Sequence, residues 1–399
     1  MTNLPQGWEV KKLGEIGEIV TGSTPSKSNL DFYGKDYPFF KPSDFEQGYF
    51  LENAGDNLSK LGFDKARQLP PKTILVVCIG SLGKVALTRV IGSCNQQINA
   101  IIPHKNIIAE YIYYYCISSK FQSILFSKAP QTTLAILNKT EFSKLEIIYP
   151  KDIKEQERIV GILDESFAKI DESIKILEQD LLNLDELMQS ALQKAFNPLK
   201  DNAKENYKLP QGWEWKSLGE IANTSSGGTP SRNKKEYWEN GNIKWLKSGE
   251  LNDGYIDFIE ENITEEAIKN SSAKIFQKGT LLIAMYGATA GKLGILNLDS
   301  TTNQAICAFL HKDKNIKFLE KFLFYFLFFL RDKIIKDSFG GAQPNINQTY
   351  IKNLQIPLPP IKEQEQIASH LDELSSHVKN LKQNYQAQIK DLQELKNSL

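Results

Sequence analysis

An internal repeat with a period of roughly 205–209 residues constrains this chain more than any other feature of its sequence. The motif Leu-Pro-Gln-Gly-Trp-Glu at residues 4–9 returns at residues 209–214. Further matches follow in the same order: Leu-Gly-Glu-Ile at 13–16 and 218–221, Gly-x-Thr-Pro-Ser at 22–26 and 227–231, Gly-Lys at 83–84 and 291–292, Asn-Gln at 95–96 and 303–304, Ile-Lys-Glu-Gln-Glu at 153–157 and 361–365, and Leu-Asp-Glu at 163–165 and 371–373. Ordered matches of this kind indicate one scaffold used twice, and the divergent stretches between them carry what differs between the halves.

Each half combines a mixed globular block with a long helix. Short β-like runs at 73–79 and 280–286 are separated by Gly, Pro, Asn and Ser turns, and apolar helix candidates lie at 111–117 and 318–330. The predicted domains are a first block at 1–153, a central helix at 154–197, a second block at 198–360 that begins with a short linker, and a C-terminal helix at 361–399. The expected fold class is α+β, with two pseudo-symmetric blocks joined by two long helices.

The two helices carry apolar residues at alternating steps of four and three, the heptad spacing of a coiled coil. The first stripe contains Leu163, Phe167, Ile170, Ile174, Leu177, Leu181, Leu184, Met188 and Ala191, and the second contains Ile367, Leu371, Leu374, Val378, Leu381, Tyr385, Leu392, Leu395 and Leu399, with Gln388 as its one polar member. We expect the two stripes to bury each other in an antiparallel coiled coil, which would make a rigid rod between the blocks. The alternative is that each helix packs only on its own block.

Composition and charge restrict the class of protein more than they identify it. The formal net charge of the 399 residues is zero, but residues 1–153 and 197–360 each carry roughly three excess positive charges, whereas 154–196 carries about five excess negatives. This distribution permits nucleic-acid binding without requiring it. The four cysteines have no C-x-x-C spacing, and neither a signal peptide nor a membrane span is recognisable. A cytoplasmic location is therefore expected.

The complete plan resembles the DNA-specificity subunit of type I restriction–modification systems. The resemblance rests on Leu-Pro-x-Gly-Trp opening each half, on Gly-x-Thr-Pro-Ser shortly after it, and on the Asn-Gln pairs. It also rests on Gly-Gly-Ala-Gln-Pro-Asn-Ile-Asn at 340–347 and on Ile-Pro-Leu-Pro-Pro-x-x-Glu-Gln at 356–364 before a heptad helix. The first half departs from this pattern, because Pro-Gln-Thr-Thr at 130–133 and Tyr-Pro-Lys-Asp at 149–152 occupy the matching places.

The resemblance implies that each block is a target-recognition domain that reads one element of a split double-stranded DNA site. It implies a complex with methylation subunits, expected to be two, to which restriction subunits are added. The chain would need no cofactor of its own, because S-adenosylmethionine would bind only to the methylation subunit. The alternatives are the specificity subunit of a related type IIB or phage-defence methylation system, and a coiled-coil scaffold without a DNA role.

A search for catalytic motifs favours a non-catalytic chain. Residues 287–293 resemble a phosphate-binding loop, but they are one residue short between the glycines, and Leu293 stands where Ser or Thr would bind magnesium. We interpret this segment and its counterpart at 80–85 as turns. The chain has no Asn-Pro-Pro-aromatic motif of an adenine methyltransferase, and its four histidines are scattered.

The candidate DNA contacts are polar and basic residues on matched loops, because Arg, Lys, Asn and Gln read base edges while Lys, Arg, Ser and Thr hold phosphates. An equally weighted interpretation is that the Thr-Pro-Ser loops are structural turns. The Asn-Gln pairs at 95–96 and 303–304 are expected to support the fold through hydrogen bonds to the backbone. The predicted DNA-binding residues are Thr24, Ser26, Lys27, Lys41, Lys84 and Gln131 in the first half, and Thr229, Ser231, Arg232, Lys234, Lys235, Lys247, Lys292 and Gln343 in the second.

Overall fold

A computed structural model describes residues 4–129, 135–196, 209–312, 317–337 and 346–398 of the chain. It divides into two compact units, Met1–Glu178 with Gln386–Leu399, and Gln179–Tyr385. Each unit contains one globular block together with parts of two long helices, α6 (Ile153–Phe196) and α11 (Ile361–Ser398). Candidate contacts Gln131 and Gln343 and the stripe residue Leu399 lie outside the described residues.

The N-terminal block runs from β1 to β10. Its strands are β1 (Trp8–Lys12), β2 (Gly17–Thr21), β3 (Tyr33–Phe40), β4 (Phe50–Leu51), β5 (Asp56–Leu58), β6 (Ile74–Val77), β7 (Val85–Thr88), β8 (Ser93–Cys94), β9 (Ile98–Pro103) and β10 (Glu146–Pro150). Its helices are α1 (Leu13–Ile16), α2 (Lys60–Lys65), α3 (Ala109–Ile117), α4 (Ser119–Lys128) and α5 (Lys139–Ser143), with 3₁₀ turns η1 (Leu30–Phe32) and η2 (Pro42–Gln47).

The C-terminal block runs from β11 to β21 and repeats most of this order, with the additional strand β16 and with the single helix α9 where the first block has α3 and α4. Its strands are β11 (Glu214–Ser217), β12 (Ala222–Ser226), β13 (Ile243–Leu246), β14 (Gly254–Ile256), β15 (Asn262–Ile263), β16 (Ile275–Phe276), β17 (Leu281–Ala284), β18 (Leu293–Leu296), β19 (Ser300–Thr302), β20 (Ile306–His311) and β21 (Gln355–Leu358). Its helices are α7 (Leu218–Ile221), α8 (Glu265–Lys269), α9 (Glu320–Lys336) and α10 (Gln348–Asn353), with 3₁₀ turns η3 (Lys235–Tyr237) and η4 (Ser248–Glu250).

The two blocks share one sheet topology. A five-stranded sheet has the order β2-β9-β6-β7-β4 in the first block and β12-β20-β17-β18-β14 in the second, and the pairs β1-β10 and β11-β21 correspond in the same way. A smaller sheet, β5-β3-β8 or β15-β13-β19-β16, completes each block. The predicted α+β class with two pseudo-symmetric blocks is confirmed.

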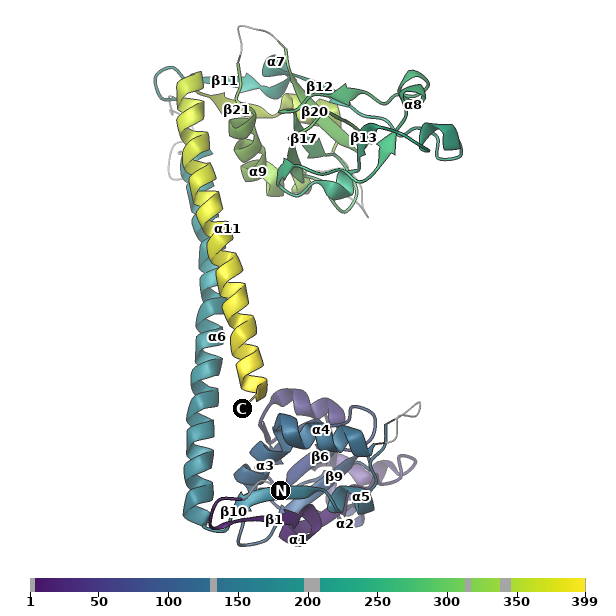
Figure 1. Cartoon of the computed structure of the whole chain (residues 1–399), viewed down its shortest axis with the longest axis vertical. Helices are drawn as coiled ribbons and strands as arrows, with labels where there is room; N and C mark the ends of the chain where they lie inside the picture. The colour runs from purple at the N-terminus through teal and green to yellow at the C-terminus, as the bar shows by residue number, and fades with distance from the viewer. Residues whose placement is uncertain (1–3, 130–134, 197–208, 313–316, 338–345, 399) are drawn as a thin grey trace. The chain divides into compact units, whose positions relative to one another are not determined.

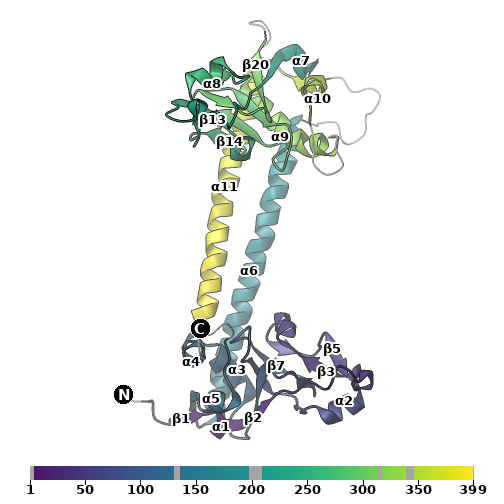
Figure 2. The same cartoon turned by 90° about the vertical axis from the view of Figure 1, so that its right-hand side faces the viewer.

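Both faces of each five-stranded sheet are covered, which explains the uninterrupted apolar runs at 74–77 and 281–284. In β17, Leu281 and Ile283 face a cluster with α9, whereas Leu282 and Ala284 face a second cluster beneath the smaller sheet. Figure 1 shows α9 beside β17 and β20, and Figure 2 shows α3 beside β7 in the other block. The predicted helices at 111–117 and 318–330 correspond to α3 and α9, and the latter extends to Lys336.

The long helices run antiparallel and bury their apolar stripes. In the second unit, Met188 and Leu192 of α6 pack with Leu371 and Ala368 of α11, and Lys382 pairs with Asp185. In the first unit, Lys396 of α11 pairs with Asp171 of α6, and its ammonium lies over the ring of Phe167. The predicted antiparallel coiled coil is confirmed, whereas the spacing of the two blocks along a rod stays a prediction.

The stripe predicted for the second helix is wrong over its last part. Leu381 and Leu395 are 39% and 47% exposed, and Gln388 is exposed as well. The half-buried positions are instead their neighbours Lys382, Ile389 and Lys396. A straight α-helix drifts from a strict seven-residue repeat, so the buried face moves onto the next residue. The aliphatic stems of the two lysines cover the stripe while their ammonium groups reach carboxylates.

A buried glutamine fastens each long helix to its block. Gln156 is fully buried; it accepts a hydrogen bond from the Ile108 N–H at 2.9 Å and donates to the carbonyls of Asn106 and Pro150 at 3.2 and 2.9 Å. Gln364 repeats the arrangement with the Leu319 N–H and the carbonyls of Lys317 and Pro359. We call each set of three bonds a glutamine clamp. The repeated Ile-Lys-Glu-Gln-Glu motif therefore serves the joint between helix and block.

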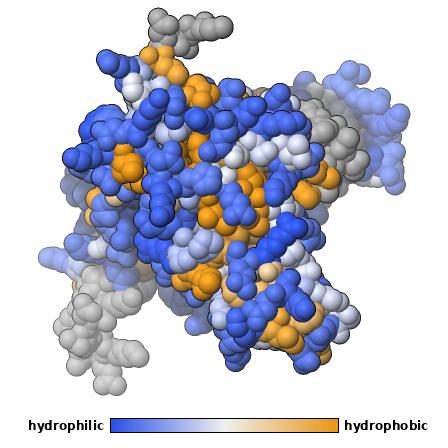
Figure 3. All heavy atoms as spheres, turned by 90° about the horizontal axis from the view of Figure 1, so that it is seen from below, coloured by the Kyte–Doolittle hydropathy of each residue, from blue (hydrophilic) through white to orange (hydrophobic). Residues whose placement is uncertain are grey.

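Figure 3 shows hydrophilic residues over much of one face, with hydrophobic residues gathered in a band among them. Large hydrophobic side chains exposed in the first block include Val10, Leu30, Leu61 and Ile91. Because such side chains are common on protein surfaces, they do not mark a binding site by themselves. No helix in the described parts of the chain is long and apolar enough to cross a membrane.

Candidate nucleic-acid interface

The Thr-Pro-Ser loops follow β2 and β12 and are tied down by a threonine. The Thr24 hydroxyl donates to Gln96 Oε1 at 2.5 Å, and Thr229 donates to Gln304 in the same way. The first glycine of each loop has a steric role, because a Cβ on Gly227 would lie 2.1 Å from the Thr302 carbonyl oxygen. Both threonine hydroxyls are therefore engaged inside the protein, which matches the structural interpretation of these loops.

The Asn-Gln pairs behave only partly as expected. Asn95 and Asn303 each accept a hydrogen bond from the N–H two residues later, at 3.1 and 3.2 Å, as backbone support requires. The expectation is wrong for Gln96 and Gln304, because their side-chain oxygens accept from threonine hydroxyls. Each pair thus links the turn before β9 or β20 to the Thr-Pro-Ser loop.

An aromatic side chain holds the far end of each loop. The Tyr33 hydroxyl donates to the Pro25 carbonyl at 2.8 Å, and Trp238 Nε1 donates to the Ser231 carbonyl at 3.1 Å. Beyond this bond, Ser26 and Lys27 are exposed, and the Ser26 hydroxyl shares a hydrogen bond with that of Ser28. Since no described residue forms an ion pair with Lys27, its side chain can reach a phosphate without giving up such a contact.

Lys41 and Lys247, which occupy matching places in the two halves, are each paired with an acid. Lys41 pairs with Asp56, and Lys247 Nζ lies 2.8 Å from Glu261 Oε1. The two acids occupy corresponding places, since Phe39 is opposite Asp56 in the β3–β5 ladder and the Trp245 N–H donates to the Glu261 carbonyl. Both lysines are thus positioned by the fold, each against a carboxylate.

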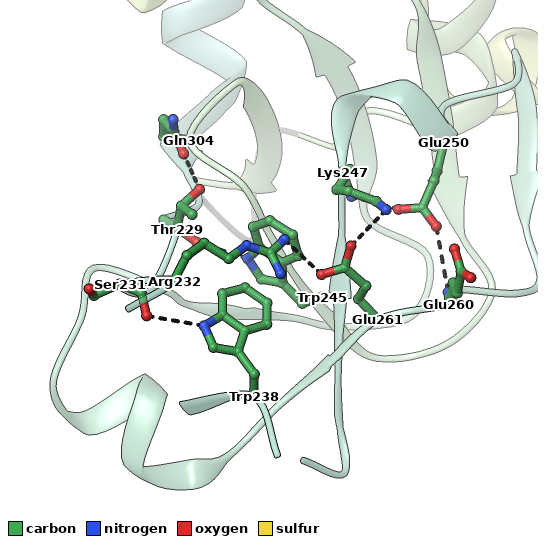
Figure 4. Close-up of polar contacts among 11 residues, drawn as sticks. Thr229, Ser231, Arg232, Trp238, Trp245, Lys247, Glu250, Glu260, Glu261 and Gln304 are labelled. Carbon is green, nitrogen blue, oxygen red and sulfur yellow. Dashed lines mark hydrogen bonds and ion pairs between the residues drawn. The ribbon is translucent and has the colours of Figure 1, made fainter. Parts of the chain in front are cut away.

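The second loop adds a cluster around Arg232, shown in Figure 4. The guanidinium carbon lies 3.6 Å from the ring centroid of Trp238 and 4.8 Å from that of Trp245. Arg232 Nη2 lies 2.7 Å from Glu261 Oε2, so this carboxylate bridges Arg232 and Lys247. We call Arg232, Trp238, Trp245, Lys247 and Glu261 the arginine cluster.

The bridging carboxylate is held in its ionised form. Burial alone would raise the pKa of Glu261, but hydrogen bonds from Arg232 and Lys247 and their positive charges together lower it below its ordinary value. The pKa of Lys247 is raised, chiefly by its hydrogen bond with Glu261. The cluster therefore carries two cations and one anion at neutral pH, which leaves one net positive charge.

The remaining basic candidates differ in their exposure and in whether they contact a polar or acidic side chain. Lys234 Nζ lies 3.0 Å from the Tyr237 hydroxyl. The Lys235 side chain is 85% exposed, and its Nζ lies 4.0 Å from Glu239 Oε1, a long distance for an ion pair. Lys84 pairs with Glu46 at 2.9 Å, and Lys292 is exposed. Together with Lys27, Lys235 and Lys292 are therefore the candidates whose charges are least engaged by the described residues of the protein.

The loops that resemble phosphate-binding loops are turns, as predicted. Residues 287–292 connect the antiparallel strands β17 and β18, and no helix begins there. The Gly291 carbonyl accepts from Arg331 Nε at 3.0 Å, and the matching Gly83 carbonyl accepts from Gln122 Nε2 at 2.9 Å. Among the described residues, no group of His, Cys, Asp and Glu side chains is arranged to hold a metal ion.

Sequence reasoning missed Glu261, Asp56, Trp238 and Trp245. Glu261 is 14 residues from Lys247, and only the strand pairing brings the two together. The repeat offered a signal, because an acid stands at both corresponding places, 56 and 261. An alignment of the two halves shows the acids Asp56 and Glu261 at matching places, but not which lysine each of them contacts.

Comparison with solved structures shows a shared fold. The chain superposes on a chain of a type I R-M system, studied for its complex assembly and conformational transition, with a TM-score of 0.77 and 20% identity; the match covers 100% of this chain and 97% of that chain. It superposes on the HsdS subunit from Thermoanaerobacter tengcongensis with a TM-score of 0.67 and 20% identity, covering 99% and 96% of the two chains.

Sequence comparison leads to the family. The chain is 38% identical over 186 residues to the HindI specificity subunit of Haemophilus influenzae, a match that covers 45% of this chain and 40% of that protein. It is 26% identical over 371 residues to the MjaIX specificity subunit of Methanocaldococcus jannaschii, covering 90% and 84%. A family model described as type I restriction modification DNA specificity domain matches residues 5–181 and 210–391. The chain therefore belongs to the type I restriction–modification DNA specificity family, whose domain it contains twice.

Proposed function

We propose that this chain is the non-catalytic DNA-reading subunit of a type I restriction–modification complex, and that each block reads one element of a bipartite site. The observation that carries the proposal is the duplicated loop framework. The threonine–glutamine and lysine–carboxylate contacts recur at corresponding places, and an aromatic side chain binds a loop carbonyl in both blocks, at Pro25 in the first and one place later at Ser231 in the second. The residues presented on that framework differ, as two readers of different sequences require.

The proposal includes partners and their chemistry. Double-stranded DNA is the ligand of both blocks, methylation subunits bind S-adenosylmethionine and transfer the methyl group to adenine N6, and restriction subunits complete the complex. The relatives named as specificity subunits of type I restriction enzymes support this assignment. The chain itself supplies position and sequence selection in the cytoplasm, and needs no cofactor.

Methylation of a DNA library tests the proposal. The chain, its methylation subunit and the mixture are each incubated with labelled S-adenosylmethionine and DNA, and the methylated sites are mapped. Only the mixture should transfer methyl groups, and its sites should share two short elements around an unspecific spacer. Methyl transfer by this chain alone would contradict the non-catalytic role, and a continuous site would contradict one element per block.

A further inference from the structure

The arginine cluster holds one guanidinium in a fixed orientation, whereas the other loop cations are more freely exposed. Trp238 and Trp245 meet edge to face with ring centroids 5.0 Å apart, and Arg232 lies over both rings. Trp238 is itself fixed by its bond to the Ser231 carbonyl, and Trp245 by a bond from its Nε1 to the Gly228 carbonyl at 3.0 Å. The aromatic platform and the loop that carries Arg232 therefore form one rigid piece.

The guanidinium keeps most of its donors available. Glu261 engages Nη2 of Arg232, and among the described residues this side chain makes no other hydrogen bond. The Arg232 side chain is still 51% exposed, whereas that of Glu261 is only 27% exposed. An arginine presents five N–H donors in a planar fork, so donors remain for a ligand while Glu261 engages Nη2.

This arrangement suits a base better than a phosphate. A phosphate contact needs only a cation within reach, and the exposed Lys27 and Lys235 meet that need. A guanine offers O6 and N7 in the major groove, and an arginine fork binds both when its plane is correctly oriented. Fixing the side chain beforehand lowers the entropy lost on binding. Stacking on the tryptophans and the bond to Glu261 thus fix the plane of the fork before DNA binds, as bidentate reading of a guanine needs.

We infer that Arg232 reads a guanine in the DNA element bound by the C-terminal block, and that Glu261 is the positioning residue that orients its guanidinium. This inference rests on the proposed function. The first block lacks the device, because Lys27 stands in the place of Arg232 and Tyr33 in the place of Trp238. A lysine has no fork for bidentate recognition.

The test measures methylation of a library in which every position of both elements is varied in turn. The complex is assembled with parent chain, with Arg232→Ala, with Arg232→Lys or with Glu261→Gln. Both Arg232 variants should lose about tenfold or more of the discrimination at one G·C pair of the second element. Arg232→Lys keeps the charge, so the salt dependence of DNA binding should stay as in the parent. Glu261→Gln should weaken discrimination at the same pair by a smaller factor.

Matched controls separate this inference from the proposed function. Lys235→Ala should lower methylation of all sequences alike, and every variant should discriminate the first element as the parent does. A second element without a guanine, an Arg232→Lys variant with parental discrimination, or a uniform loss in Arg232→Ala would each overturn the inference. In those cases a bipartite site in the parent would still support the proposed function.

Discussion

The Thr-Pro-Ser loops of the two blocks differ in what they present, although the same contacts hold both of them. In the first block the loop ends in the exposed Ser26 and Lys27. In the second block Arg232 is stacked on two tryptophans and bound by Glu261. By contrast, both loops share the hydrogen bond from threonine to glutamine and a hydrogen bond from an aromatic side chain to a loop carbonyl.

This difference indicates which positions of the duplicated chain can differ between the halves. Side chains that face inward keep each loop in place, so their pattern returns in the second half. Side chains that face outward meet the ligand, and one position can hold a free cation in one half and an oriented guanidinium in the other. A test of the comparison must therefore change one half and observe both.

The largest effect is expected from breaking one glutamine clamp. Gln156→Leu leaves the Ile108 N–H and the carbonyls of Asn106 and Pro150 without their partner. Gln364→Leu does the same in the second half. Since each buried unsatisfied group costs roughly 1–3 kcal/mol, each variant should lower the free energy of unfolding of its own block by about 3 kcal/mol, measured by urea denaturation.

Cysteine labelling tells which half has been loosened. Burial raises the pKa of Cys78 and Cys94 in the first block and of Cys307 in the second to about 12, so the native thiols should react slowly. Gln156→Leu should speed labelling of the first two and Gln364→Leu that of Cys307. Gln179→Leu on the exposed face of α6 is the control and should change neither. Equal acceleration in both halves would refute half-specific clamps.

An intermediate effect is expected from removing one exposed lysine from each loop region. Lys27→Ala and Lys235→Ala should each lower the slope of log affinity against log salt by roughly one, because one phosphate contact is lost. Binding of the assembled complex to its site is titrated at several salt concentrations. If the slope of log affinity against log salt is the same in a variant as in the parent, that lysine does not contact DNA. If a variant instead changes the preference for one base pair, that lysine reads a base, and the contrast with Arg232 is wrong.

The smallest effect concerns the acid side of the arginine cluster. The pKa of Glu261 in the folded chain is below its ordinary value of 4.5, so its contribution to stability is present above that value and lost as the pH falls through and below it. Glu261→Gln removes this contribution, which is at most about 1 kcal/mol for a partly exposed pair. Urea denaturation between pH 7 and pH 3 should show a slightly smaller acid loss in the variant, and an identical loss would show that the pair is fully screened.

The sequence predicted the architecture because the repeat and the heptads are local patterns. It could not predict that Ile389 rather than Gln388 enters the helix contact, since this depends on the accumulated rotation of a straight helix. The candidate site was predicted in part. The loops and Arg232 follow from matched motifs, whereas Glu261 reaches Arg232 and Lys247 only through the pairing of β13 with β15. Contacts made across strand ladders leave no spacing in the chain from which to infer them.

The glutamine clamps have a consequence for how such a protein can evolve. In the described residues, the clamp side chains of Gln156 and Gln364 meet main-chain N–H and carbonyl groups of their blocks. Main-chain groups are the same in every sequence, so this part of the joint tolerates new side chains in the block, whereas the bonds of Tyr114 to Asp164 and of Tyr325 to Asp372 depend on the tyrosine. A block that kept its fold and this tyrosine could therefore change its outward-facing residues without a new attachment to the long helix.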